Sequence, residues 1–154
     1  MDSTILFGFL LIINGLLVAV AVVVHYETLY QLARTLPHLR SVLPRYRVLL
    51  GVFIILTAHA VEIWLFAIGY YGMLQIEGMG TMSGQISGHG SLMDCVYHSF
   101  VTFSTVGSVD VIMNGNLRYL TGMEALTGFV LITWSASFLF LEMQKYWPST
   151  KSHS

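Results

Sequence analysis

The sequence predicts an all-α membrane protein, with three transmembrane helices and one short re-entrant helix between the second and the third. Of 154 residues, 55% are hydrophobic and 10% are charged, and the mean hydropathy is +0.71. Soluble domains usually carry about 25% charged residues. Three apolar runs also reach the roughly 20 residues that a helix needs to cross a bilayer. So few charges cannot cover a water-soluble fold, and that class is excluded.

The net charge and the cysteine content exclude further classes. The formal net charge is −1, which provides no basic surface for nucleic acid. Cys95 is the single cysteine, so the chain has no intrachain disulfide, and no Cys/His spacing typical of a zinc site is present.

The three expected spans are residues 5–24, 48–71 and about 122–143. The first has neither the basic start nor the small-residue cleavage site of a signal peptide, so we interpret it as a retained helix. At the start of the third, Thr121 is followed three residues later by Glu124, a spacing that predicts a capping box.

A different kind of segment separates the second and third spans. Residues 69–90 contain seven of the fourteen glycines and predict a flexible surface loop. Residues 92–103 form an apolar run that is too short to cross a bilayer, which predicts a re-entrant helix. Residues 114–116, Asn-Gly-Asn, predict a turn.

The basic residues predict the orientation in the membrane, because cytoplasmic loops carry an excess of lysine and arginine. Six of the seven lie between the first two spans or after the third, and one lies between the second and third. We therefore expect the amino terminus outside and the carboxyl terminus in the cytoplasm. The arginines of the first loop either contact anionic lipid or only satisfy this rule. The basic residues are, in that order, Arg34, Arg40, Arg45, Arg47, Lys145 and Lys151, and then Arg118.

A re-entrant segment implies a pore or a cavity, since irregular backbone at membrane depth persists only where protein or water satisfies its polar groups. The carboxyl end of a helix carries partial negative charge, and the carbonyl groups of the following turn can replace the hydration shell of a cation. Hydroxyl oxygens add to these acceptors at Thr102, Ser104, Thr105 and Ser108.

Residues 97–110, YHSFVTFSTVGSVD, resemble the pore region of the potassium-channel superfamily. With the flanking spans, the chain is similar to small bacterial ion channel proteins of the two-transmembrane pore class, with one extra leading span. The resemblance covers about residues 48–147. It implies that Thr105, Val106 and Gly107 correspond to the first three residues of the selectivity filter, and Asp110 to the acidic residue at its outer end.

The sequence departs from the family pattern at two filter positions. Ser108 stands in place of an aromatic residue, and Val109 in place of the second glycine. A β-branched residue strongly disfavours the positive φ that glycine adopts freely. We therefore expect only the inner carbonyl rings of such a filter, and no strict potassium selectivity.

The resemblance also implies an assembly and a division of the chain. It implies a homotetramer in a bacterial inner membrane, without enzymatic activity, cofactor or resident metal, and with K⁺ or Na⁺ as the permeant ion. Residues 1–47 would form the leading helix and basic loop, residues 48–147 the pore module, and residues 148–154 a short tail.

Several residues are candidates for the pore. With the third span lining the inner pore, Gly128 is either a bend in that helix or a close-packing position, and Ser135 is a wall residue. Glu124 is either the capping-box residue or part of an acidic ring at the outer mouth. Asp110 either forms such a ring or hydrogen-bonds the re-entrant helix and braces the filter.

His59 and Glu62 lie on one face of the second span, at a spacing of three residues. They are interpreted as a hydrogen-bonded pair that fixes packing, as a proton-sensing element, or as metal ligands. A metal site needs third and fourth ligands. We expect His25 and His98 to be poor partners, because the predicted topology places them near opposite membrane faces.

Three functions follow in order of preference. The first is a subunit of a cation channel that conducts monovalent ions through residues 105–107. The second is a channel-like accessory or scaffold protein that does not conduct. The third is a metal-binding membrane protein that uses His59, Glu62 and the methionines around residues 73–93.

Overall fold

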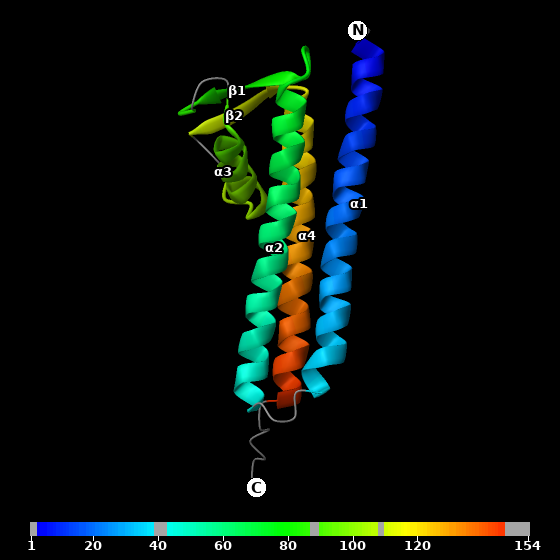
Figure 1. Cartoon of the computed structure of the whole chain (residues 1–154), viewed down its shortest axis with the longest axis vertical. Coiled ribbons are helices and arrows are strands. Elements are labelled where there is room, and N and C mark those ends of the chain that lie inside the picture. Colours follow the sequence, from blue (N-terminus) through cyan, green and yellow to red (C-terminus); the bar gives the residue numbers. More distant parts are fainter. Residues whose placement is uncertain (1–2, 39–42, 87–89, 108–109, 147–154) are drawn as a thin grey trace, which may run out of the picture.

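The computed structural model describes residues 3–38, 43–86, 90–107 and 110–146. Three long helices run side by side through the height of the molecule: α1 (Ser3–Thr35), α2 (Pro44–Leu74) and α4 (Leu117–Tyr146) (Figure 1). Each is long and apolar enough to cross a membrane. The predicted fold class, an all-α protein with three membrane spans, is confirmed.

The helices extend beyond the predicted spans. Helix α1 continues past residue 24 to Thr35 and is followed by a short 3₁₀ helix, Leu36–His38, while α4 begins at Leu117 rather than near residue 122. Hydropathy marks only the part of a helix that lies in hydrocarbon, and the helix itself continues into the polar interface. As a consequence, His25 lies inside α1 and not at its end.

The predicted re-entrant helix is α3 (Leu92–Phe103), with the expected bounds. It packs beside α2 and α4 over part of their height, on the side away from α1 (Figure 1). Ser91 begins the helix with a capping box, since its side chain accepts from the Asp94 amide and the Asp94 carboxylate accepts from the Ser91 amide. These contacts satisfy backbone donors at the start of the helix.

The prediction of a flexible loop over residues 69–90 is wrong in part. Helix α2 continues to Leu74, and β1 (Gly80–Gly84) pairs antiparallel with β2 (Val111–Gly115) (Figure 1). The predicted turn at residues 114–116 mostly belongs to β2. At Gly84 φ is +114°, and a β-carbon would lie 2.0 Å from the Asp110 carbonyl oxygen, so the close pairing requires glycine. The strands join the two ends of the segment that contains α3.

Two apolar clusters fill the interior. The larger joins α3 and the hairpin to the three long helices, and the smaller joins α1, α2 and α4 near their other ends. Along each long helix, a polar residue separates the two clusters: His25 lies between Ala21 and Leu29 in α1, and Ser135 between Leu131 and Phe138 in α4. In α2 the same position is taken by His59 and Glu62. Polar groups therefore form a layer between the clusters.

Candidate functional site

The backbone reverses direction immediately after α3. The Thr105 amide donates to the Thr102 carbonyl at 2.9 Å, and the Gly107 amide donates to the Val101 carbonyl at 2.9 Å. Among the residues that the structure describes, Thr105 is the one residue other than glycine with a positive φ, +60°. This conformation costs an L-residue about 1–2 kcal/mol. Strain of this kind concentrates at functional sites.

The segment that follows is exposed in the protomer. Gly107 has a φ of +77°, so two residues of positive φ flank Val106, whose side chain is 78% exposed. Such alternation turns successive peptide groups toward one side of the chain. Ser108 and Val109, which carry the departures from the family pattern, lie outside the described residues.

Asp110 lies where the chain leaves this segment and enters β2. Its side chain is exposed and accepts a hydrogen bond of 3.5 Å from the Tyr97 hydroxyl of α3, and its carbonyl accepts one of 2.8 Å from the Gln85 amide. Of the two interpretations from the sequence, this geometry is the one expected for a contact that braces the segment against α3.

Gly128 is a close-packing position. A β-carbon there would lie 2.1 Å from the carbonyl oxygen of Phe103, the last residue of α3. Helix α4 is continuous through this residue. The absence of a side chain lets the backbone of α4 touch the carboxyl end of α3, and this contact sets the position of the segment that follows it.

Both interpretations of Glu124 from the sequence are wrong. Helix α4 begins at Leu117, so Thr121 is an interior residue, and its hydroxyl donates to the Leu117 carbonyl rather than capping the helix. The Glu124 side chain is fully buried and cannot line an outer mouth. It accepts hydrogen bonds from the Tyr70 hydroxyl of α2, at 2.7 Å, and from the Ser99 hydroxyl of α3. Glu124 thus ties the re-entrant helix to two spans.

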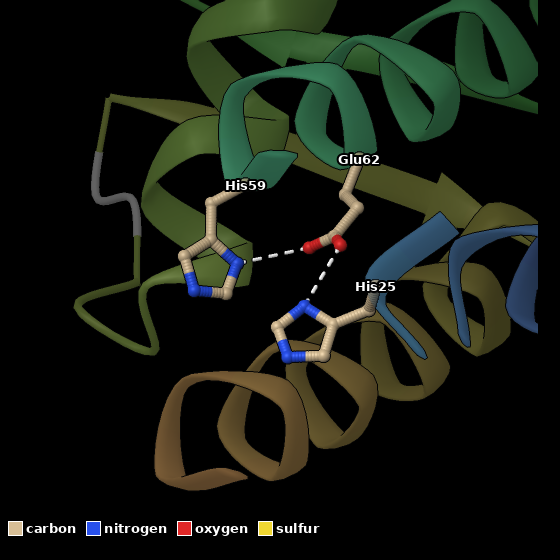
Figure 2. A group of neighbouring side chains, drawn as sticks. All are labelled: His25, His59 and Glu62. Carbon is tan, nitrogen blue, oxygen red and sulfur yellow. Dashed lines mark hydrogen bonds and ion pairs between the residues drawn. The ribbon is translucent and has the colours of Figure 1, made fainter. Parts of the chain in front are cut away.

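A second group of polar side chains joins α1, α2 and α4. One carboxylate oxygen of Glu62, Oε1, is hydrogen-bonded to His25 Nδ1 at 3.0 Å. The other, Oε2, is hydrogen-bonded to His59 Nδ1 at 2.9 Å. Figure 2 shows both imidazole rings directed at the carboxylate, from α1 and from α2. Glu62 is fully buried and His25 is 1% exposed.

Ser135 closes these contacts into a ring. Its Oγ lies 3.1 Å from His59 Nε2 and 3.3 Å from His25 Nε2. The expectation that Ser135 is a wall residue of the pore is wrong for the protomer, since its side chain is buried against α1 and α2. We name the group His25, His59, Glu62 and Ser135 the polar ring.

The expectation that His25 is a poor partner for His59 and Glu62 is also wrong. It assumed that the first span ends near residue 24, whereas α1 continues to Thr35 and places His25 level with Glu62. His98 does lie apart from the ring, on α3, where its Nε2 is 3.3 Å from the Thr121 hydroxyl.

Comparison with known proteins identifies the family. A family model described as "Ion channel" matches residues 52–145. The chain belongs to this ion channel family. No curated protein and no solved structure gives a significant match. The protein is therefore a multi-pass membrane protein of the ion channel family, and the resemblance to a channel pore module is confirmed.

The family model covers only part of the polar ring. The matched residues include His59, Glu62 and Ser135, together with α3 and residues 105–107. They do not include α1, and therefore not His25. The ring joins the leading helix of this ion channel protein to the matched module.

Sequence reasoning missed Tyr70 and Ser99 as partners of Glu124. One signal was available in the sequence: Glu124, Tyr70 and Ser99 carry a carboxylate and two hydroxyl groups on apolar helices. Each of these groups needs a partner at membrane depth. What the sequence does not contain is the rotation of each helix about its axis, which decides which polar groups meet.

Replacing Tyr70 with phenylalanine tests this contact. The change removes a buried hydroxyl that donates to Glu124, and we expect it to lower the free energy of unfolding by about 1.5–3 kcal/mol. The adjacent Tyr71 is exposed, so Tyr71→Phe is the matched control and should have little effect. Thermal unfolding of both variants in detergent measures the difference. Equal stability of the two variants would contradict the assigned hydrogen bond.

Proposed function

We propose that the protein is the pore-forming subunit of a channel for monovalent cations, with residues 105–107 at the conduction path. The observation that carries this proposal is the exposed, positive-φ turn after a re-entrant helix. Backbone polar groups at membrane depth require protein or water around them. The amides of Thr105 and Gly107 donate within the protomer, but both residues are exposed there, so other copies or a water-filled path must surround this segment.

The chemistry of this segment favours cations over anions. The carboxyl end of α3 carries partial negative charge, and it leads directly into the carbonyl groups of residues 104–107. The Thr105 hydroxyl and the exposed Asp110 carboxylate add oxygen ligands on the same segment. With Ser108 and Val109 in place of the aromatic residue and glycine of a potassium filter, conduction of both K⁺ and Na⁺ is expected.

Assembly as a homotetramer is part of the proposal. One chain supplies one re-entrant segment, which cannot enclose a path alone, and the resemblance to the potassium-channel superfamily sets the number at four. The distribution of basic residues supports a cytoplasmic carboxyl terminus, which would place the hairpin and α3 toward the outer face of a bacterial inner membrane. Proton sensing by His59 and Glu62 stays a prediction.

Ion flux into liposomes tests the proposal. Purified protein should carry K⁺ or Na⁺, and Gly107→Ala should reduce the flux by about ten-fold or more, because alanine at a φ of +77° is strained. Gly122→Ala is the matched control, since a β-carbon meets nothing within 4 Å at either position and residue 122 lies in a regular helix. Its flux should equal that of the wild type.

Two results would contradict the proposal: verified insertion without flux of any monovalent cation, or equal flux from Gly107→Ala and the wild type.

A second candidate, a non-conducting accessory protein, is favoured by Val109 at the position of a filter glycine. The double variant Ser108→Tyr, Val109→Gly separates the two. Conduction that appears only in this variant would support the accessory protein.

A further inference from the structure

We propose that His25, His59 and Glu62 bind a divalent transition-metal ion of the zinc class. The proposal concerns a site of its own and does not depend on conduction. Its first support is convergence: one ligand atom from each residue lies within 4.8 Å of the others. Figure 2 shows one nitrogen of each imidazole directed at a different oxygen of the Glu62 carboxylate.

The distances suit such an ion. The two Nδ1 atoms lie 3.0 and 2.9 Å from the carboxylate oxygens. Zinc ligands lie about 2.0–2.2 Å from the metal, so two ligands of a tetrahedral ion are about 3.3 Å apart. Small side-chain movements would therefore admit an ion between the three groups. The third ligand that the sequence interpretation lacked is supplied by His25.

The donor set selects the class of metal. Two imidazole nitrogens and one carboxylate, without sulfur, suit Zn²⁺, Ni²⁺, Co²⁺ or Cu²⁺, whereas Mg²⁺ and Ca²⁺ prefer oxygen ligands alone and Cu(I) prefers sulfur. Three protein ligands of this kind leave a fourth coordination position for water. The interpretation built on the methionines is not needed for this site.

Ser135 is placed to orient both histidines. When Nδ1 binds a metal, the ring carries its proton on Nε2 and donates it to an outer partner. The Ser135 hydroxyl lies 3.1 and 3.3 Å from the two Nε2 atoms, and its oxygen has two lone pairs, so it can accept from both. Ser135 is therefore a positioning residue that favours the metal-binding tautomer of both rings.

The number of hydrogens in the polar ring leads to a second testable consequence of the proposal. Without an ion, the four contacts of the polar ring need four hydrogens, of which Ser135 supplies one. His25, His59 and Glu62 must then carry three, which leaves the group neutral. With an ion bound, they carry only two, one on each Nε2. Metal binding should therefore release one proton and weaken as the pH falls.

The location gives the site a structural role. It lies between the two apolar clusters and joins α1, outside the matched channel module, to α2 within it. Ionisable groups at membrane depth are rare and face the interior of a bundle, where they pair with each other or a ligand. A bound ion would fasten the leading helix to the pore module.

Equilibrium dialysis against Zn²⁺ with elemental analysis tests the proposal on the full-length protein. The protein is purified without a histidine tag and stripped with chelator. We expect one Zn²⁺ per protomer, no saturable Mg²⁺, and release of about one proton per ion in a weakly buffered solution. His25→Gln, His59→Gln and Glu62→Gln should each reduce the affinity at least ten-fold, and Ser135→Ala about ten- to a hundred-fold.

The controls keep loss of folding apart from loss of binding. His38 is an exposed histidine away from the ring, so His38→Gln should bind like the wild type. A glutamine at position 62 can accept from one imidazole and donate to the other, so Glu62→Gln keeps all four contacts of the ring and should fold. Added Zn²⁺ should raise the unfolding temperature of the wild type but not that of this variant.

Several results would overturn the proposal: no saturable Zn²⁺ binding by the wild type, binding that His25→Gln and His59→Gln leave unchanged, or binding without proton release, which would exclude Nδ1 ligation in this ring. No flux is measured in any of these experiments. A failure here is therefore distinct from a failure of the proposed channel function.

Discussion

Replacing Gly128 with alanine is expected to destabilise the protein and to displace the end of α3. The new β-carbon would lie 2.1 Å from the Phe103 carbonyl oxygen, 2.8 Å from its carbonyl carbon and 2.9 Å from its α-carbon. These are backbone atoms, which cannot rotate away as a side chain can. Overpacking typically costs about 1–3 kcal/mol, and the effect should be at the upper end of this range.

The matched control is Gly122→Ala in the same helix, where a β-carbon meets nothing within 4 Å. Alanine is a better helix former than glycine by about 1 kcal/mol, so this variant should be as stable as the wild type or more so. Thermal unfolding in detergent compares the two variants. If Gly128→Ala were as stable as Gly122→Ala, the close contact between α4 and α3 would be wrong.

The same substitution should abolish ion flux in the proposed channel. Thr105 lies two residues after Phe103, so a shift that relieves the clash moves the start of residues 105–107, which the proposal places at the conduction path. Carbonyl ligands act only when they are held at defined positions around the ion. Liposome flux of Gly128→Ala should be lost at a temperature at which the variant remains folded, while Gly122→Ala conducts.

Replacing Glu62 with alanine has the other large expected effect. The carboxylate is fully buried and is the shared partner of His25 and His59. Its removal leaves the buried imidazole of His25 and the half-buried imidazole of His59 without their shared partner. Breaking a buried ion pair by removal of one partner typically costs about 3–5 kcal/mol, and we expect a loss of this size in the free energy of unfolding.

Two further variants show whether the loss of stability in Glu62→Ala comes from the contacts of Glu62 or would follow the removal of any carboxylate. Glu62→Gln preserves hydrogen-bonding groups at the same positions and should lose much less stability than Glu62→Ala. Glu77 is exposed beyond the end of α2, so Glu77→Ala should be close to wild type. Thermal unfolding of the three variants gives the order. A Glu62→Ala variant as stable as Glu77→Ala would show that the polar ring does not hold the helices together.

The part of the fold that depends on composition was predictable. The three spans and α3 follow from runs of apolar residues and their lengths, because the bilayer sets the length that a crossing helix needs. The β1–β2 pairing was not, since Gly84 and Val111 are separated by the whole of α3 and no local pattern records their register.

The candidate site also has a part that was predictable from the sequence and a part that was not. A backbone turn at residues 105–107 was predictable from the short helix and the Thr-Val-Gly that follows it. The capping box at Thr121 and Glu124 was a local pattern that the tertiary structure overrode: Asn116 donates to the Met79 carbonyl beside the hairpin, and the helix begins at the next residue. Glu124 is then an interior residue, available to Tyr70 and Ser99.

His25 shows most clearly which part of the site could not be predicted from the sequence. It follows Ala21 and precedes Leu29, each at a spacing of four residues, so it continues the buried stripe of α1. Extending the first helix beyond its apolar run would have placed it at membrane depth. The identity of its partners would still have been unknown, because helical periodicity defines a face but not the helix that covers it.

The sequence by itself determined that this protein lies in a membrane, how many times it crosses and where the re-entrant segment lies, because these depend on the free energy of transferring each residue from water to hydrocarbon. Only the tertiary structure decided that Gly128 receives the end of α3, that Glu124 is buried, and that His25 joins His59, Glu62 and Ser135. These contacts depend on the rotation and offset of whole helices, which are set by packing between segments distant in the chain.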